Sequence, residues 1–332
     1  MLRHSILARR LNAVHPKYLR GLSTGQKSLR EDILGRIERG DYRFENAACL
    51  CGSTDFAPLS NIDKHLLPMH IDLCRDCGMV LQSRRLDQKS LGHFYEHYYR
   101  ELYNPGLRGD AEAYDIQIGL QPAHTWIMER LPSRPNVVFE VGIHFGALLH
   151  AFHQDRCQVA GSDYDSIGVQ YARERLGMAN CFAGPSMELE KTGQRADLLI
   201  YKHVFEHIND LDAELSTARR LLKDGGFLYL AVPGVLSWVE RKEHNVLDTL
   251  QLAHSWYFTL PHLTYLAACH GFEKIHGDTE VQALFRKAAL PAALPPAPDE
   301  RTTVLAGLRR EERLWQRVRL RRKVRRLFGR KG

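Results

Sequence analysis

The sequence has no long apolar run. None of its stretches approaches the roughly 18 apolar residues of a membrane-spanning helix, and its start, Met-Leu-Arg-His-Ser-Ile, lacks the apolar core of a signal peptide. Its seven cysteines are odd in number, and four of them stand in two tight pairs, which favours a metal in a reducing compartment over disulfide bonds. These absences argue against a membrane-spanning or disulfide-stabilised protein and predict a cytoplasmic one.

Positive charge is in excess only at the two ends of the chain. The formal charge is +7, yet residues 309–332 hold twelve Arg or Lys against two Glu, and residues 1–45 hold ten against five. Residues 46–308 are therefore net acidic. With 44% hydrophobic and 26% charged residues, the composition is that of a globular protein. Because residues 46–308 are net acidic, this distribution of charge does not favour an enzyme that binds nucleic acid along the whole of this region.

The chain is organised around residues 136–146, which read Asn-Val-Val-Phe-Glu-Val-Gly-Ile-His-Phe-Gly. The first half predicts a buried parallel strand that ends on Glu140 and turns through Gly142 and Gly146 into an apolar-periodic helix. Glycine lets the backbone approach a ligand closely, and doubly wound sheets build nucleotide sites from this pattern. Asp163 ends the next candidate strand, 21 residues after Gly142, where a carboxylate can accept both ribose hydroxyls of a nucleoside.

The segments that follow complete a family pattern. A candidate strand at 197–201 precedes Lys-His-Val-Phe-Glu-His-Ile, and a candidate helix at 212–223 leads through Asp-Gly-Gly into a strand at 227–232. The order and spacing resemble class I S-adenosylmethionine-dependent methyltransferases. The resemblance implies an α/β fold, a doubly wound and mostly parallel seven-stranded sheet of Rossmann-like type, with S-adenosylmethionine as cofactor. The residues that carry it are Glu140, Gly142, Gly146, Asp163, His203–His207 and Leu221–Leu228.

The same resemblance assigns the cofactor site. Glu140 would hold the amino group of the methionine part in the loop that Gly142 and Gly146 turn, and Asp163 would hold the ribose hydroxyls. The adenine would lie against Tyr164 and Met187.

The family's middle loop glycine is replaced here by His144. We expect its imidazole to point away to solvent. The alternative is that the ring occupies the crevice and weakens or abolishes cofactor binding.

Methyl transfer is an in-line displacement that requires aligned reactants, exclusion of water and, for some acceptors, a base. His203 and His207 follow the fourth strand, at the carboxyl edge where open sheets bind ligands. Glu206-His207 matches the family's Glu-His pair, so His207 is the candidate base and Glu206 its orienting residue. A role for the pair in bracing the loop stays open. His254 is a second-choice acceptor-site residue.

Four cysteines have the spacing of metal ligands. Cys49-Leu-Cys51-Gly and Cys74-Arg-Asp-Cys77-Gly are separated by 22 residues, which predicts a four-thiolate zinc ribbon. A closed site of this kind would be structural, with the glycines allowing the tight turns. The first pair is shorter than the usual Cys-x-x-Cys, and free cysteines are the alternative.

A cysteine knuckle, then an aromatic segment with Tyr95, Tyr98 and Tyr99, then the cofactor domain resembles bacterial methyltransferases that modify deoxysugars and surface polysaccharides. In these relatives such tyrosines also close over the substrate. The sugar C-methyltransferases carry a further large C-terminal domain that the sequence does not predict here. The acceptor is therefore a small molecule or glycan, including a sugar or a sugar-lipid, and O- and C-methylation both stay open.

The sequence predicts five consecutive segments. These are a basic helical segment (1–45), a zinc ribbon (46–90), an aromatic helical cap or linker (91–131), the cofactor domain (132–288), and a Pro/Ala linker with a basic tail (289–332). In the first segment, Ser28 and Glu31 have the form of a capping box.

The basic tail is helix-compatible with an imperfect apolar face. We expect peripheral contact with an anionic membrane at its inner face, and nucleic-acid binding or a solvated tail are the alternatives.

Two further functions stay open. An RNA methyltransferase would use the ribbon and tail on RNA, but the sequence lacks the Asn/Asp-Pro-Pro-Tyr of base amino-methylation. A non-catalytic binding protein on the same scaffold is the third hypothesis, and His144 motivates it.

Overall fold

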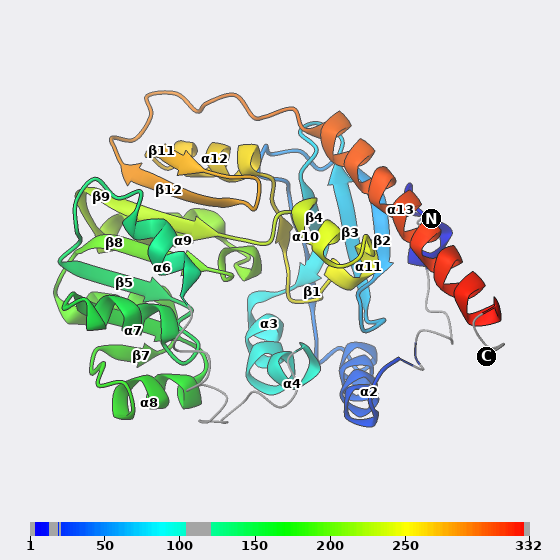
Figure 1. Cartoon of the computed structure of the whole chain (residues 1–332), viewed down its shortest axis with the longest axis horizontal. Coiled ribbons are helices and arrows are strands. Elements are labelled where there is room, and N and C mark those ends of the chain that lie inside the picture. Colours follow the sequence, from blue (N-terminus) through cyan, green and yellow to red (C-terminus); the bar gives the residue numbers. More distant parts are fainter. Residues whose placement is uncertain (1–3, 13–18, 20, 104–120, 329–332) are drawn as a thin grey trace. The chain divides into compact units, whose positions relative to one another are not determined.

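The structure, a computed structural model, describes residues 4–12, 19, 21–103 and 121–328, with side chains to residue 322 (Figure 1). The chain forms two compact units that interleave in sequence. The first unit contains residues 1–87, 233–261 and 297–332, and the second contains residues 88–232 and 262–296. The sequence predicts five consecutive segments and no interleaving of this kind. Residues 233–261 and the basic tail belong to the same unit as the cysteine region.

The second unit is built on a seven-stranded sheet in the order β11-β12-β9-β8-β5-β6-β7 (Figure 1). The strands from β9 to β7 pair in parallel, and β12 is antiparallel to both of its neighbours. This is the predicted doubly wound, mostly parallel seven-stranded sheet. Strand order reverses between β5 and β8, the point at which open sheets bind ligands. The strands are β5 (Val137–Val141), β6 (Gln158–Asp163), β7 (Cys181–Ala183), β8 (Ala196–Lys202), β9 (Leu222–Ala231), β11 (Phe272–Gly277) and β12 (Gln282–Lys287).

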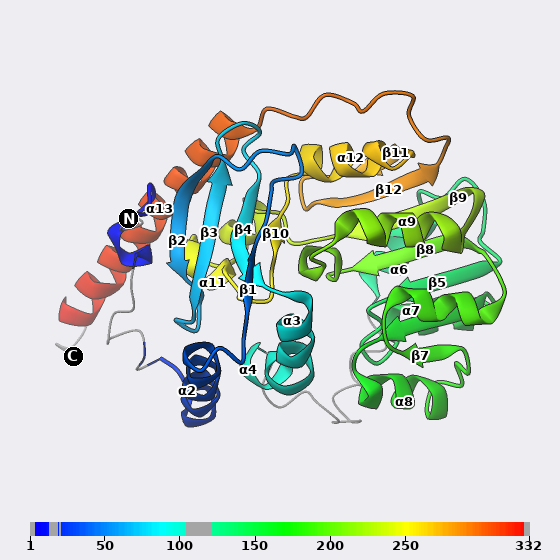
Figure 2. The same cartoon turned by 180° about the vertical axis from the view of Figure 1, so that it is seen from behind.

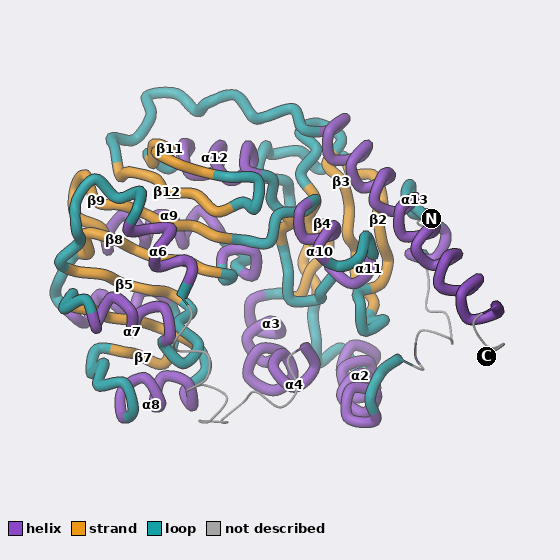
Figure 3. Tube along the Cα trace, viewed as in Figure 1, coloured by secondary structure: helices purple, strands orange, loops and turns teal. Residues whose placement is uncertain are grey.

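Helices cover this sheet, as the tube drawing shows (Figure 3). Helix α7 packs on β5 and β6, and α9 packs on β8 and β9. Every residue of β5 is buried, because a parallel strand covered on both faces has no solvent side. The helical elements are α3 (Gln88–Phe94), the π-helical turn η2 (Tyr95–Tyr99), α4 (Arg100–Tyr103), α6 (Pro122–Met128), α7 (Ala147–Gln154), α8 (Ser166–Glu174), η3 (Ser186–Thr192), η4 (Phe205–His207), α9 (Leu211–Leu221) and α12 (Leu260–Cys269).

The first unit is built on an antiparallel sheet in the order β1-β4-β3-β2, with β10 also paired to β4 (Figure 2). The strands are β1 (Phe44–Asn46), β2 (Phe56–Ile62), β3 (Pro68–Cys74), β4 (Val80–Leu86) and β10 (Trp256–Tyr257). The pairs Trp256↔Leu81 and Tyr257↔Val80 join segments far apart in sequence. Gln82 strengthens this join, since its Nε2 donates to the carbonyls of Leu252 and His254 at 2.9 and 2.7 Å. Residues 233–261 are therefore part of the cysteine-bearing sheet.

The N-terminal helix begins earlier than expected. Helix α2 (Thr24–Glu38) is capped by Ser23, whose Oγ accepts from the Gln26 N–H at 3.1 Å while the Gln26 side chain accepts from the Ser23 N–H. The predicted capping box of Ser28 and Glu31 is wrong, because both residues lie inside the helix. The same Ser-x-x-Glu/Gln pattern occurs twice, and the earlier copy forms the cap.

The basic tail is helical, as expected, and forms α13 (Arg301–Phe328). Its two glutamates are buried in the first unit. Glu312 pairs with Arg10 at 2.6 Å and Glu311 pairs with His244 Nδ1 at 2.5 Å. The helix start is joined to the cysteine region, since the Glu300 N–H donates to the Cys77 carbonyl at 2.9 Å. This helix is therefore docked on its unit rather than free in solvent.

Three short helices complete the first unit, namely η1 (Arg9–Leu11), α10 (Ser237–Arg241) and α11 (Val246–Thr249). Across the residues that the structure describes, no helix combines the length and apolar composition needed to cross a bilayer.

Candidate functional site

The loop between β5 and α7 turns through left-handed backbone. The φ angles are 76° at Gly142, 55° at His144 and 90° at Gly146. Glycine adopts this conformation freely, whereas a residue with a side chain loses roughly 1–2 kcal/mol. A Cβ at Gly142 would lie 2.0 Å from Cγ2 of Val204, so the chain after β8 packs directly on the bare glycine backbone. The two glycines serve as predicted, and His144 occupies a conformation that suits the glycine it replaces.

The imidazole of His144 lies partly inside the protein. It is half-buried, with its ring centroid 4.6 Å from that of Phe145. Burial, with the positive charges of Arg100 and Lys202 nearby, lowers the pKa of His144 to about 3. The ring is therefore neutral at physiological pH. The expectation that it points away to solvent, and the alternative that it occupies the crevice, both stay predictions.

Asp163 ties the glycine loop to the next helix. Its Oδ2 accepts the His144 N–H at 2.7 Å and its Oδ1 accepts the Asp165 N–H at 2.8 Å. Burial raises the pKa of Asp163, and these two N–H donors oppose that rise. Asp165 in turn caps α8 by accepting the Ile167 N–H and pairs with Arg100 at 2.9 Å. The predicted ribose ligand is thus fixed at the end of β6, beside the loop.

Gly168 supports this arrangement, and sequence reasoning missed it. A Cβ at Gly168 would lie 2.1 Å from the carbonyl oxygen of His144, so α8 approaches the loop as closely as a bare backbone allows. The available signal was a glycine inside a helix, five residues after Asp163, since glycine is disfavoured in helix interiors.

Two buried glutamates lie at the carboxyl edge of the sheet. Glu140 is 3% exposed and Glu206 is 2% exposed, and burial raises the pKa of each to about 8. Among the described residues, the Oε2 atom of each has no hydrogen-bond partner. A buried carboxylate is costly unless a cation or donor joins it. Both side chains are therefore suited to receive a positively charged or hydrogen-donating group.

His207 lies between tyrosines of the aromatic segment and Glu206. Its Nδ1 is 2.5 Å from the Tyr95 hydroxyl, and its Nε2 is 3.7 Å from Glu206 Oε1. The rings of Tyr95 and Tyr99 meet the imidazole edge-on at 5.6 and 5.5 Å. Both tyrosines belong to the π-helical turn η2, a geometry frequent at functional sites. The structure thus joins the predicted pair to two of the three candidate tyrosines, while Tyr98 is buried in the core.

Of the other two candidate histidines, one belongs to each unit. His203 belongs to the second unit and is exposed, with a left-handed φ of 57° and its N–H donating to the Ala231 carbonyl at 2.8 Å. His254 belongs to the first unit, where its ring stacks on Trp238 at 5.3 Å.

The residues expected to flank adenine are exposed. Tyr164, directly after β6, is 64% exposed, and Met187, at the start of η3, is 55% exposed. Large apolar side chains on a surface are typical of ligand or partner contacts when they gather at one place. Their exposure is compatible with the predicted role.

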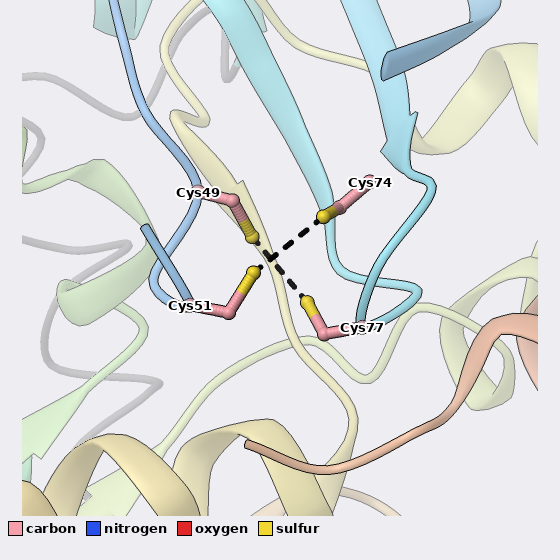
Figure 4. A group of neighbouring side chains, drawn as sticks. All are labelled: Cys49, Cys51, Cys74 and Cys77. Atoms are coloured by element: carbon pink, nitrogen blue, oxygen red, sulfur yellow. Dashed lines mark hydrogen bonds between the residues drawn. The ribbon is translucent and has the colours of Figure 1, made fainter. Parts of the chain in front are cut away.

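The four paired cysteines converge, with their sulfurs within 4.8 Å of one another (Figure 4). The Sγ–Sγ distance is 3.4 Å for Cys49 and Cys77 and 3.7 Å for Cys51 and Cys74. Four sulfurs bound tetrahedrally to zinc at about 2.3 Å would be about 3.8 Å apart. The donor set and its spacing therefore fit a zinc ion.

The two knuckles have the expected turns. Gly52 and Gly78 have φ angles of 85° and 83°, and their N–H groups donate to the carbonyls of Cys49 and Cys74 at 2.8 and 3.0 Å. Hydrogen bonds from neighbouring thiols and then from backbone N–H groups lower the pKa of Cys74. A thiolate at this position is the form that binds a metal.

Comparisons with known sequences and structures found similar proteins. Residues 120–276 match the sequence family described as "Methyltransferase domain", a range that contains the glycine loop, Asp163 and Glu206-His207. None of the curated proteins matches this chain in sequence.

Three similar solved structures are described as methyltransferases. The CurJ carbon methyltransferase has 17% identity and a TM-score of 0.42, over 61% of this chain and 64% of that one, so this chain spans less than two thirds of its length. The 1,6-didemethyltoxoflavin-N1-methyltransferase of Burkholderia thailandensis, with bound S-adenosylhomocysteine, has 18% identity and a TM-score of 0.42, over 65% and 98%. The CcbJ methyltransferase of Streptomyces caelestis has 16% identity and a TM-score of 0.41, over 54% and 96%.

Proposed function

We propose that this chain, whose residues 120–276 match the methyltransferase domain, transfers a methyl group from S-adenosylmethionine to a small molecule or glycan, at a hydroxyl or carbon of a sugar or sugar-lipid. The observation that carries the proposal is the contact between Tyr95 and His207. It supplies a proton acceptor at the carboxyl edge of the sheet, and the neighbouring aromatic rings offer apolar faces to an acceptor.

The residues of the second unit fit the cofactor. Bound S-adenosylmethionine supplies a methyl group on a positively charged sulfur. Glu140 has a buried oxygen without a partner, which suits a cationic ligand, and the left-handed backbone of Gly142 turns the chain directly after β5. Asp163 would hold the ribose hydroxyls, with Tyr164 and Met187 beside the adenine. All five residues lie at or just beyond the carboxyl ends of β5, β6 and β7, at one edge of the sheet.

In this proposal His207 receives the acceptor's proton through Tyr95. When the Tyr95 hydroxyl donates to Nδ1, the neutral imidazole carries its own proton on Nε2, on the side of Glu206. The acceptor O–H transfers its proton to the Tyr95 oxygen while the Tyr95 proton moves to Nδ1. The resulting imidazolium lies beside Glu206, whose pKa of about 8 leaves a part of this side chain ionised near neutral pH to stabilise the positive charge.

The test is methyl transfer by the full chain from radiolabelled S-adenosylmethionine to a panel of nucleotide-sugars, lipid-linked sugars and RNA. We expect label in a sugar-containing acceptor and its loss in His207→Ala, with His203→Ala as the matched exposed control. Label in RNA alone would favour the RNA methyltransferase. Absence of S-adenosylhomocysteine binding at high micromolar concentration would leave a binding protein on this scaffold.

We also propose that Cys49, Cys51, Cys74 and Cys77 hold a structural Zn²⁺. The support is the sulfur spacing and the four-thiolate donor set, which leaves no open coordination position for catalysis. Protein purified under reducing conditions should contain one zinc per chain by elemental analysis, and Cys74→Ser should lose it. The isolated Cys269→Ser is the control and should keep the metal. Metal-free protein with four free thiols would refute the site.

We further propose that α13 docks on an anionic membrane surface. Arg309, Arg313 and Arg317 are exposed and spaced by four residues, so they share one face of the helix, whereas Glu311 and Glu312 are buried on another. Each basic residue near such a surface contributes on the order of 1 kcal/mol. Charge segregation of this kind supports a polyanionic partner, and exposed Leu320 favours a lipid surface over RNA.

Vesicle co-sedimentation tests the docking. The full chain should bind vesicles that contain phosphatidylglycerol and not vesicles of phosphatidylcholine alone, and a triple Arg309/Arg313/Arg317→Glu variant should lose that binding. The control is Arg219→Glu combined with Arg286→Glu in the second unit. Equal binding by the triple variant, or a preference for RNA over the anionic vesicles, would overturn the proposal.

A further inference from the structure

A groove in the first unit lies between the beginning of α13 and the strands β2 and β3. Helix α13 packs on β3 and runs beside this sheet (Figure 2). The groove has a volume of about 320 Å³, which is within the range of about 300–1,000 Å³ for small-molecule sites. All of its lining residues belong to the first unit, so it is distinct from the cofactor site. We call it the α13 groove.

The two strands give the α13 groove an apolar lining. Ala57 of β2 and Leu73 of β3 are buried lining residues, and Ile6 and Leu305 are half-buried ones. Ile6 is held at the sheet because its N–H donates to the Pro58 carbonyl at 2.8 Å. A hydrocarbon chain that displaces water from such a lining is stabilised by the hydrophobic effect.

Helix α13 uses one face to dock and leaves the next face at the groove. The residues buried in the first unit share a face by their helical spacing, and they are Val304, Leu308, Glu311 and Glu312. The residues that line the groove also recur three and four positions apart, and they are Thr302, Leu305, Ala306 and Arg309. Two of these four have short side chains, which accounts for the space between the helix and the strands.

The charged residues at the groove are all basic. Among the described residues that line it, three are arginines and none is acidic. Arg301 is engaged by Asp299 at 2.7 Å. Arg75 pairs with Asp55 at 3.3 Å, but both side chains are more than half exposed, and such pairs contribute little. Arg309 is exposed, and its guanidinium makes no ion pair or hydrogen bond within the described part of the chain. Arg75 and Arg309 can therefore receive an anionic group.

We propose that the α13 groove binds one molecule of an anionic phospholipid, with its phosphate at Arg75 and Arg309 and an acyl chain along Leu73 and Leu305. This inference rests on the proposed docking of α13 on an anionic membrane. Guanidinium groups bind phosphate through paired N–H donors. The amino end of α13, whose first two residues line the groove, adds a partial positive charge.

The position of Arg309 connects the groove to the membrane-docking face. Arg309 lines the groove, and it also belongs to the exposed face that carries Arg313 and Arg317. A membrane that meets this face therefore brings its phospholipids to the groove. The apolar lining favours a lipid over nucleic acid, because a sugar-phosphate backbone has no hydrocarbon chain to place against Leu73 and Leu305.

Calorimetry of the full chain with three soluble ligands tests the site, with both octyl compounds kept below their micelle concentrations. Octyl phosphate has a chain and an anion, inorganic phosphate has only the anion, and octyl glucoside has only the chain. We expect octyl phosphate to bind at least about tenfold more tightly than either, because the apolar contact and the charged hydrogen bonds act together. Arg309→Gln should weaken octyl phosphate by about tenfold and leave octyl glucoside unchanged.

Ala306→Trp should abolish octyl phosphate binding, because the indole fills the groove without changing its charge. Thr303→Trp is the matched control, since Thr303 is exposed on α13 and is not among the described residues that line the groove. If Ala306→Trp does not fold, the order of the three affinities in the unmodified protein still decides. Inorganic phosphate or octyl glucoside that binds as tightly as octyl phosphate would overturn the proposal.

Vesicle co-sedimentation separates this proposal from the docking of α13. Ala306→Trp should bind phosphatidylglycerol vesicles several-fold less tightly than Thr303→Trp, and the remaining affinity comes from Arg313 and Arg317. Vesicle binding by the unmodified protein without any octyl phosphate binding would refute the lipid site and leave the docking intact. Octyl phosphate binding without vesicle binding would refute a membrane as the source of the ligand.

Discussion

The Tyr95 hydroxyl lies 2.5 Å from Nδ1 of His207, although the two residues are 112 positions apart in sequence. The contact is made in the second unit, by a tyrosine of the π-helical turn η2 and a histidine of η4. Burial raises the pKa of Tyr95 well above its usual value, so its hydroxyl keeps its proton at neutral pH and can donate it. The aromatic segment therefore contributes directly to the group that we assign to proton transfer.

Tyr95→Phe should slow methyl transfer to a hydroxyl acceptor by about 100-fold or more, within the range expected for general base catalysis. The ring packing on His207 is kept and only the hydroxyl is lost. Affinity for S-adenosylhomocysteine should not change, and the pH dependence of the rate should. Tyr98→Phe, which removes a hydroxyl from a core tyrosine, is the control. An unchanged rate with a proven acceptor would remove Tyr95 from the mechanism.

Glu206→Gln should alter how stability depends on pH. The pKa of Glu206 is about 8 in the folded protein against an ordinary 4.5, because burial disfavours its charged form. The folded state thus holds a proton that the unfolded state has released, so this residue's contribution to stability falls as pH rises from 4.5 to 8. Denaturant unfolding should show the variant gaining stability relative to the unmodified protein between pH 5.5 and 8. A difference that stays constant across this range would contradict the prediction.

His144→Gly should strengthen cofactor binding several-fold. The substitution relieves the left-handed strain at φ 55° and removes a half-buried ring from the loop. Stability should change by about 1 kcal/mol or less, because strain relief and lost packing oppose each other. His144→Ala is the matched variant, since it removes the ring and keeps the strain. Weaker S-adenosylhomocysteine binding by both variants would show that the imidazole contributes to the site.

Gly168→Ala should destabilise the protein by about 1–3 kcal/mol, the usual cost of overpacking, and weaken cofactor binding. The added methyl would clash with the His144 carbonyl oxygen at 2.1 Å. Gly92→Ala is a matched control, because Gly92 is also helical and a Cβ there meets nothing within 4 Å. Thermal unfolding should place the control at or above the unmodified protein. Equal effects of the two substitutions would mean that α8 can shift away from the loop.

Local patterns in the sequence were sufficient for the frame of the site. The run before Glu140 predicted a strand buried along its length, and the glycines at 142 and 146 adopt the left-handed backbone that only glycine adopts freely. The two cysteine pairs converge as their spacing and following glycines indicated. Each of these features depends on residues close together in the chain, where conformation follows from residue type.

Contacts between residues that are far apart in the sequence could not be predicted from local patterns. The pairing of β10 with β4 joins Trp256 to Leu81, and no local signal specifies a partner so distant in sequence. The close approach of Gly168 in α8 to the His144 carbonyl depends on a helix that follows the next strand, and the pattern of glycines in the loop cannot report it. The misplaced capping box has another cause, because two copies of one motif compete within a few residues and packing selects between them.

The docking of α13 has a consequence for the order in which the protein forms. Val304 and Leu308 are buried in the first unit, and the backbone before the helix is hydrogen-bonded to Cys77. The core of the first unit therefore contains residues from both ends of the chain, and it can be completed only after α13 has been synthesised. During synthesis the middle of the chain can reach its final structure while the beginning is still unfinished.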